Sequence, residues 1–290
     1  MTLEQLRIFI GVAEREHVTR AAEALNVTQS AASGAIAALE ARYGVALFHR
    51  IGRGITLTEA GRAFLDEARL VMRQAAHAEK ILAEFTGMAR GTLSIVASQT
   101  IASYWLPARL AAFRTLYPQI ELALGIDNTE GVAARILDGS ADLGFIEGMI
   151  NEASLARWVV ATDPMVLVSH ENAGPVDTQW LRTARWIMRE QGSGTRSTCD
   201  GIIKAHGIDP ASLTIAMTLP SNEAVRSAVE AGAGVAMLSR LVVERALMRG
   251  DLIELPLVLP DRSFHALRHK ERSRSRAADA FTDLIRGLKS

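Results

Sequence analysis

Apolar residues in the first third of the chain recur at the spacing of helices, not strands. A first helix is predicted from four residues that share one face: Leu6, Phe9, Ile10 and Ala13. A second is predicted over residues 19–25, and a third begins after Thr28, a favourable N-cap, and ends at Gly44. Two helices joined by so short a turn predict a helix-turn-helix.

The third predicted helix has two different faces. One is predicted to pack inward through Ala32, Ile36, Leu39 and Tyr43. The other carries small or uncharged residues: Gln29, Ser30, Ser33, Gly34 and Ala37. Such a face can approach the floor of a DNA groove, where hydroxyl and amide groups hydrogen-bond base edges. The alternative is that this face is simply solvated, and for an isolated helix that would be the better interpretation. The segments next to the helix therefore decide between DNA binding and a solvated face.

The segment that follows the third predicted helix favours the interpretation as a DNA-binding domain. Two short apolar runs, residues 46–48 and 55–57, flank a turn rich in glycine and arginine and predict a β-hairpin wing. The whole chain has 32 Lys plus Arg and 32 Asp plus Glu residues, so it is neutral. Residues 42–62, in contrast, contain four arginines (residues 42, 50, 53 and 62) and a single acid, Glu59. Arg50 and Arg53 are therefore predicted to contact DNA phosphates.

A long helix is predicted to begin after Thr58. Apolar residues then alternate at spacings of four and three, namely Phe64, Ala68, Val71, Ala75, Ala78, Leu82 and Phe85. This coiled-coil seam predicts a homodimer that presents two reading heads to a symmetric DNA site. A helix buried within its own chain is the alternative.

Beyond residue 91, predicted strands alternate with predicted helices, which indicates α/β structure. Strands are expected over residues 92–96, 120–126 and 141–146, and a second series begins at Pro164. With 290 residues, the chain is long enough for several domains. Two α/β lobes are predicted.

Polar residues follow one strand in each lobe and precede a helix. The sequence GSGTR in the second lobe would direct helix-start N–H groups at a ligand, an arrangement that favours an anion. The predicted effector site comprises Ser98, Gln99, Thr100, Glu147, Ser193, Gly194, Thr195, Arg196 and Asn222. Helix capping alone is the alternative, and pairing of Arg196 with a nearby acid would favour a neutral ligand.

Motifs for other chemistry are incomplete. GSGTR lacks the lysine of a phosphate-binding loop, and Ser197 replaces the third glycine of a dinucleotide fingerprint. Gln191 stands where a nucleophile elbow needs glycine. His265 and His269 lie in a strand-like stretch, about 13 Å apart, too far to share a metal ion. No cofactor or metal is therefore expected.

The single cysteine and a basic stretch near the end of the chain are both expected to be structural. Cys199, the single cysteine, excludes an internal disulfide and is expected to be a small helix residue and not a redox switch. The basic stretch over residues 262–276 is expected to form a solvated loop-and-helix face.

The N-terminal motifs AAEALNVTQ, SGAIAALE, GVALFHR and LTEAG resemble, in order and spacing, the signature of LysR-type transcriptional regulators. LPARLAAFRTLYPQIELAL and SNEAVRSAVEAGAGVAMLS resemble the two lobes of that family's effector domain. SQTIASYWLP and REQGSGTR are similar to the branch that controls carbon fixation and sulfur or nitrogen assimilation.

The resemblance implies a winged helix-turn-helix (residues 1–58), a linker helix (59–90) and an α/β effector domain (91–290) like type 2 periplasmic binding proteins. Lobe I would comprise residues 91–162 and 268–290 and lobe II residues 163–267, with crossings near residues 161–164 and 266–270. A small effector would bind between the lobes, dimers would assemble into tetramers, and binding would alter RNA polymerase recruitment at a promoter.

By position, the resemblance assigns double-stranded DNA contacts to Thr28, Gln29, Ser30, Ser33, Arg50 and Arg53. Family members often carry Arg or Lys where this sequence has Gly34, so a base or phosphate contact made by that side chain would have no counterpart here, and the operator preference of relatives does not carry over. The predicted function is a cytoplasmic regulator without catalysis or membrane attachment. A solute-binding protein and an α/β enzyme are the alternatives, but the first predicts an export signal and the second a nucleophile or metal cluster.

Overall fold

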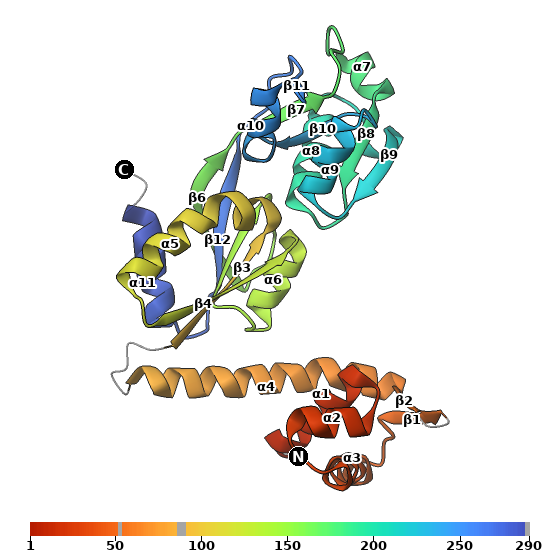
Figure 1. Ribbon diagram of the computed structural model, residues 1–290, viewed down its shortest axis with the longest axis vertical. Coiled ribbons are helices and arrows are strands. Elements are labelled where there is room, and N and C mark those ends of the chain that lie inside the picture. The colour runs from red at the N-terminus through yellow and green to blue at the C-terminus, as the bar shows by residue number, and fades with distance from the viewer. Residues whose placement is uncertain (52–53, 86–90, 288–290) are drawn as a thin grey trace. The chain divides into compact units, whose positions relative to one another are not determined.

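The computed structural model describes residues 1–51, 54–85 and 91–287 (Figure 1). The chain divides into two compact units, Met1–Ala83 and Glu84–Ser290, each with its own hydrophobic core. None of the helices in the described ranges is long and apolar enough to cross a membrane.

The first unit contains the predicted helix-turn-helix and wing. Its elements are α1 (Leu3–Arg15), α2 (Val18–Leu25), α3 (Gln29–Tyr43), the antiparallel strands β1 (Phe48–Ile51) and β2 (Gly54–Leu57), and α4 (Glu59–Phe85). The Thr28 hydroxyl accepts a hydrogen bond from the Ala31 N–H at 3.1 Å, as expected of an N-cap. Gly44 ends α3 with a φ of 68°, a conformation that glycine adopts without strain.

Phe9 of α1 is the centre of this unit's core. Its ring is fully buried and lies 5.5 Å from the ring of Phe48 in the wing and 4.9 Å from that of Phe64 in α4. The predicted inward face of α3 is confirmed for Ala32, Ile36 and Leu39. The prediction for Tyr43 was wrong. Its side chain is 55% exposed beside Arg42, because Leu39 and Leu47 already close the core at that end.

The predicted seam of α4 divides into two parts. Phe64 and Ala68 pack against the core of their own unit. Further along the helix, Val71 and Leu82 are 42% and 68% exposed. The side chain of Phe85 lies outside the described residues.

Lobe I of the second unit is a five-stranded sheet with the order β4-β3-β5-β12-β6. Helices α5 and α11 cover one face and α6 the other, because alternate residues of β3 and β5 point to opposite faces. The elements are β3 (Gly91–Ser98), the π-helix η1 (Ile101–Trp105), α5 (Leu106–Leu116), β4 (Ile120–Asp127), α6 (Thr129–Leu137), β5 (Leu143–Glu147), β6 (Leu155–Asp163), β12 (Arg262–His269) and α11 (Arg276–Gly287).

Lobe II has a central sheet in which β7 lies between β10 and β11, and β8 pairs with β9. Hydrogen bonds of Val235 with Arg185 and Ile187 join the two groups of strands. The elements are β7 (Met165–Ser169), α7 (Thr178–Thr183), β8 (Arg185–Arg189), α8 (Gly194–Ala205), the 3-10 helix η2 (Pro210–Ser212), β9 (Thr214–Leu219), α9 (Asn222–Glu230), β10 (Ala236–Ser239), α10 (Arg240–Arg249) and β11 (Ile253–Glu254).

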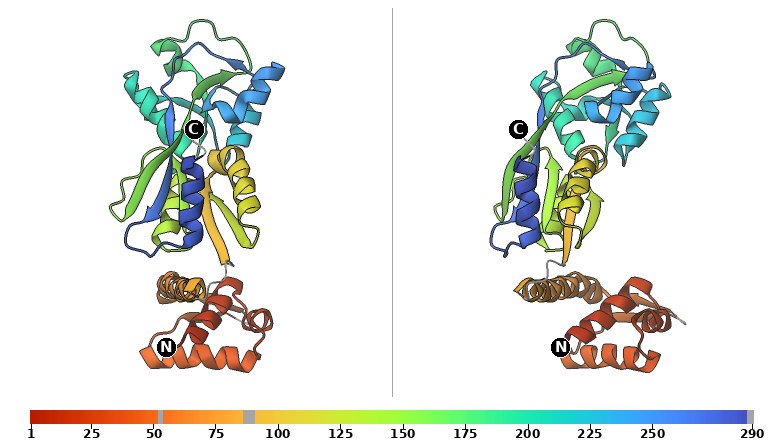
Figure 2. Two further views of the ribbon diagram at one scale, coloured as in Figure 1. Left: turned by 90° about the vertical axis from the view of Figure 1, so that its left-hand side faces the viewer. Right: turned by 60° about the vertical axis from the view of Figure 1, so that its left-hand side comes forward.

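The two lobes are connected by β6, which leads into β7, and by the returning strand β12 (Figure 2). The outward crossing lies at residues 163–165, next to the predicted position. The return lies where β12 begins, at Arg262, and not near residues 266–270. Residues 262–267 therefore belong to lobe I and not to lobe II, because β12 pairs antiparallel with both β5 and β6.

Candidate functional site

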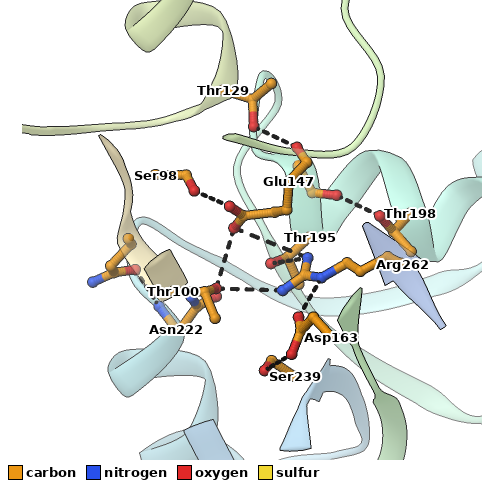
Figure 3. A network of polar contacts seen from close by, with 12 residues as sticks. Ser98, Thr100, Thr129, Glu147, Asp163, Thr195, Thr198, Asn222, Ser239 and Arg262 are labelled. Atoms are coloured by element: carbon orange, nitrogen blue, oxygen red, sulfur yellow. Dashed lines mark hydrogen bonds and ion pairs between the residues drawn. The ribbon is translucent and has the colours of Figure 1, made fainter. Parts of the chain in front are cut away.

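The two predicted halves of the effector site meet between the lobes (Figure 3). Ser98 ends β3 in lobe I, and Thr100 follows it at the start of η1. From lobe II, the Asn222 side-chain amide donates to the Thr100 hydroxyl at 2.9 Å, and its backbone N–H donates to Gln99 Oε1 at 2.7 Å. Strand ends that carry polar groups at a topological switch are where α/β sheets bind ligands.

Glu147, the last residue of β5, lies at the centre of this network. It is 1% exposed. Its carboxylate accepts hydrogen bonds from the hydroxyls of Ser98 and Thr100, the latter at 3.1 Å. Its backbone carbonyl accepts from the Thr129 hydroxyl at 2.9 Å. Burial raises the pKa of Glu147, while the positive charge of Arg262 acts in the opposite direction.

Arg262, at the start of β12, is the positive charge within the network. Its Nε lies 2.6 Å from Asp163 Oδ2, and its Nη1 donates to the Thr195 hydroxyl at 3.1 Å and lies 3.9 Å from Glu147 Oε1. Asp163 is fully buried and also accepts from the Ser239 hydroxyl at 2.6 Å. Arg262 therefore connects both lobes at the point where the chain crosses between them.

The expectation that residues 262–276 form a solvated face is wrong for Arg262, which is only 6% exposed. Its partners are far from it in sequence, so the local run of charges gives no sign of them. The alternation of Phe264 and Ala266, both buried, with charged or polar residues is the available signal for a strand.

Arg196 is paired within its own helix. Its Nε lies 3.0 Å from Asp200 Oδ1, and its Nη1 donates to the backbone carbonyl of Arg189 at 3.3 Å. The alternative predicted for Arg196, pairing with a nearby acid, is therefore the one found, and Asp200 compensates its charge. The positive charge closest to Glu147 and Thr195 in the network is therefore that of Arg262.

The glycines of GSGTR allow the lobes to approach each other. A Cβ on Gly194 would lie 2.1 Å from the backbone oxygen of Glu147 and 2.7 Å from Thr129 Oγ1, which no real side chain tolerates. Gly192 has a φ of 81°, and its carbonyl accepts from the Glu130 N–H of lobe I at 3.4 Å. Ser193, Thr195 and Arg196 are all buried beside this contact.

A second contact between the lobes adjoins the first. The side-chain amide of Gln99 donates to Glu223 at 2.6 Å, and the Tyr104 hydroxyl donates to the same carboxylate at 3.0 Å. Arg189 donates to Asn222 Oδ1 at 2.7 Å and pairs with Glu190 at 2.7 Å. All nine predicted effector-site residues thus lie within or beside one connected network, although their roles stay predictions.

The predicted DNA-contacting residues of α3 lie on its outer face. Thr28, Gln29 and Ser30 are exposed and Ser33 is half-buried. Gly34 is exposed, and a Cβ added there would meet nothing within 4 Å. Arg53 and the side chain of Arg50 lie outside the described residues.

Cys199 is 2% exposed, and burial raises its pKa to about 12. His265 and His269 both lie on β12. Within the part of the chain that the structure describes, no group of three or more His, Cys, Asp or Glu side chains is placed to hold a metal ion.

Comparison with known proteins assigns both units. Residues 3–62 match the bacterial regulatory helix-turn-helix protein family, lysR type, and residues 86–289 match the LysR substrate binding domain. The chain belongs to the LysR family of transcriptional regulators. A solute-binding protein does not account for the helix-turn-helix match, so that alternative is not favoured.

Relatives of this LysR regulator extend over its whole length. It is 35% identical over 289 residues to the transcriptional regulator YeiE of Escherichia coli (strain K12), covering 98% of this chain and 96% of YeiE. It is 31% identical over 292 residues to the RuBisCO operon transcriptional regulator of Allochromatium vinosum, covering 98% of this chain and 95% of that protein.

Two solved structures are similar in fold. Full-length CbnR complexed with its target DNA aligns with a TM-score of 0.76 and 25% identity, over 99% of each chain. The regulatory domain of Synechocystis PCC6803 CcmR, in complex with 2-PG, aligns with a TM-score of 0.62 and 25% identity, over 69% of this chain and 98% of that one.

Proposed function

We propose that this LysR regulator binds operator DNA through α3 and the wing, and that a small anion bound between its lobes modulates this binding. The observation that carries the proposal is the buried polar network in which Ser98 and Thr100 of lobe I lie close to Thr195 and Asn222 of lobe II. A ligand held there contacts both lobes, so its binding favours one arrangement of them over others.

The donors of this network suit an oxyanion. Hydroxyls of Ser98, Thr100 and Thr195 and the guanidinium of Arg262 all lie within it. The first N–H groups of α8, at residues 194–196, have no partner within the helix and add the positive end of its dipole. The complex of CcmR with 2-PG, a small anion, supports this ligand class.

On the DNA side, we propose base contacts for Gln29, Ser30 and Ser33, with Thr28 at the helix start. Arg50 and Arg53 are proposed to contact phosphates. Short side chains on α3 allow the helix backbone to lie close to base edges in the major groove.

A homodimer is proposed through the distal part of α4, where Val71 and Leu82 are exposed at coiled-coil spacing. Assembly of two dimers into a tetramer, and an effect on RNA polymerase through the DNA, belong to the same proposal. The regulator is proposed to act without catalysis, in the cytoplasm, where its DNA is.

Thermal unfolding of the full-length protein tests the effector site. Sulfate, inorganic phosphate and 2-PG are the probes. An anion present at about a hundred times its Kd stabilises its binding domain by about 2.7 kcal/mol, which is roughly 5–10 °C for a domain of this size. We expect the shift to disappear when Ser98→Ala and Thr195→Ala are combined.

The matched control combines Thr115→Ala with Ser212→Ala. These hydroxyls are exposed and bond only to nearby backbone carbonyls, at 3.0 and 2.7 Å. The control should retain the full shift. A shift that survives loss of Ser98 and Thr195 would place the site elsewhere, and the absence of any shift would refute the small-anion proposal.

A further inference from the structure

The carboxylate of Glu147 holds the hydroxyl donors that an oxyanion would need. Both of its oxygens accept hydrogen bonds, one from Ser98 and the other from Thr100 at 3.1 Å. The side chain is 2% exposed and Arg262 Nη1 lies 3.9 Å from it. An oxyanion that uses these donors must therefore lie against a buried carboxylate.

Two negatively charged groups already share one guanidinium. From β12, Arg262 lies 2.6 Å from Asp163 of β6 and 3.9 Å from Glu147. From α8, Arg196 is paired with Asp200 at 3.0 Å. A dianion added beside an ionised Glu147 would thus face two carboxylates with one arginine to compensate them.

The remaining neighbours of Glu147 do not change this balance. Its other hydrogen-bond partners among these elements are hydroxyls, those of Ser98 in β3, Thr100 at the start of η1 and Thr129 in α6, and α8 contributes the hydroxyl of Thr195 to the network. Burial already raises the pKa of Glu147. A proton placed between its carboxylate and a ligand oxygen removes the repulsion and forms a short, charge-assisted hydrogen bond.

We propose that Glu147 determines the specificity of the effector site by sharing one proton with the bound oxyanion. This inference rests on the proposed function. An oxyanion that brings its own proton or hydroxyl, such as hydrogen phosphate, donates it to the carboxylate. A fully deprotonated oxyanion such as sulfate binds only with uptake of one proton from solvent by Glu147.

The sign of the pH dependence follows. At pH values above the pKa of Glu147, sulfate affinity falls by up to about tenfold per pH unit, because one proton must be taken up for each sulfate bound. Phosphate affinity changes much less, because the proton arrives with the ligand. The preference for phosphate over sulfate therefore grows as the pH rises.

Glu147→Gln removes this requirement. The glutamine oxygen still accepts a hydrogen bond, while its amide nitrogen donates to a deprotonated ligand oxygen without a proton from solvent. We expect the variant to bind sulfate more tightly at high pH, to lose the pH slope, and to lose most of the preference for phosphate.

Titration calorimetry of the full-length protein, between about pH 6 and pH 9, tests the proposal. Sulfate, inorganic phosphate and 2-PG are the probes, and buffers of different ionisation enthalpy reveal proton uptake. Glu254→Gln is the matched control, because Glu254 lies in an exposed pair with Arg240 at 2.6 Å. The control should behave as the wild-type protein does.

Proton uptake by the wild-type protein on binding sulfate is measured without any variant, so it decides the question even if Glu147→Gln does not fold. Sulfate binding without proton uptake, or an unchanged pH slope for sulfate in Glu147→Gln, overturns this inference and leaves the proposed function standing. If none of the three anions binds, the proposed function fails and this inference fails with it.

Discussion

Replacing Arg262 with methionine is expected to destabilise the second unit strongly. The change leaves Asp163, fully buried, and Glu147, 1% exposed, without their shared positive charge. Removing one partner of a buried ion pair costs about 3–5 kcal/mol, because the other charge stays buried and uncompensated. For a domain of about 200 residues, that corresponds to a fall in Tm of roughly 6–20 °C.

The assay is thermal unfolding of the full-length protein followed by circular dichroism. Arg240→Met is the matched control, since Arg240 also lies 2.6 Å from its carboxylate, Glu254, but both side chains are more than 40% exposed (42% and 43%). An exposed pair contributes about 0–1 kcal/mol, so the control should lose at most roughly 4 °C. Adding Asp163→Asn to Arg262→Met should restore part of the loss.

Equal Tm values for Arg262→Met and Arg240→Met would show that burial of the carboxylates does not set the cost of losing the arginine, because burial is the main physical difference between the two pairs. A double variant no more stable than Arg262→Met would also count against the role of burial. In that case the buried carboxylates would not be the source of the destabilisation.

Four other outcomes are expected. Gly194→Ala should separate the lobes and abolish anion binding, because its Cβ would overlap the backbone of β5; unchanged binding in calorimetry would contradict the close approach. Arg50→Ala or Arg53→Ala should weaken DNA binding and lower its salt dependence by about one counterion, with Arg249→Ala as an exposed control, and equal salt slopes would exclude phosphate contacts. Val71→Glu should give monomers by light scattering, and a persistent dimer would place the interface elsewhere. Cys199, whose pKa burial raises to about 12, should resist a thiol reagent near pH 8 in the folded protein, and rapid labelling would show that it is accessible.

Local signals explain which elements are predictable from the sequence. The boundaries of α3 follow from Thr28 and Gly44, a hydroxyl cap and a left-handed glycine that act within a few residues of the chain. β6 was not predicted. Its pairing with β12 shifts register between Val159 and Ala161, which interrupts the alternation of burial along the strand, so its sequence shows no clean period of two.

The candidate site is predictable where its residues follow strand ends. Ser98 ends β3 and Thr195 lies in the first turn of α8, each in a short polar segment where a strand gives way to a helix, and this pattern can be recognised in the sequence alone. Arg262 and Asp163 are separated by 99 positions, and their pairing depends on the antiparallel return of β12 along β6. Charge alone does not distinguish Arg262 from Arg274 and Arg276, which follow it and are exposed.

The contacts of Phe9 have a mechanical consequence for DNA recognition. Because one ring packs against both the wing and α4, the helix-turn-helix and wing are held firmly against the linker helix α4. Along an α-helix, each residue is rotated by about 100° about the helix axis and displaced by about 1.5 Å along it. In a dimer joined through α4, a rotation of one α4 helix relative to the other therefore moves the two wings by the same rotation. The spacing between the two DNA half-sites that the dimer can bind changes with it.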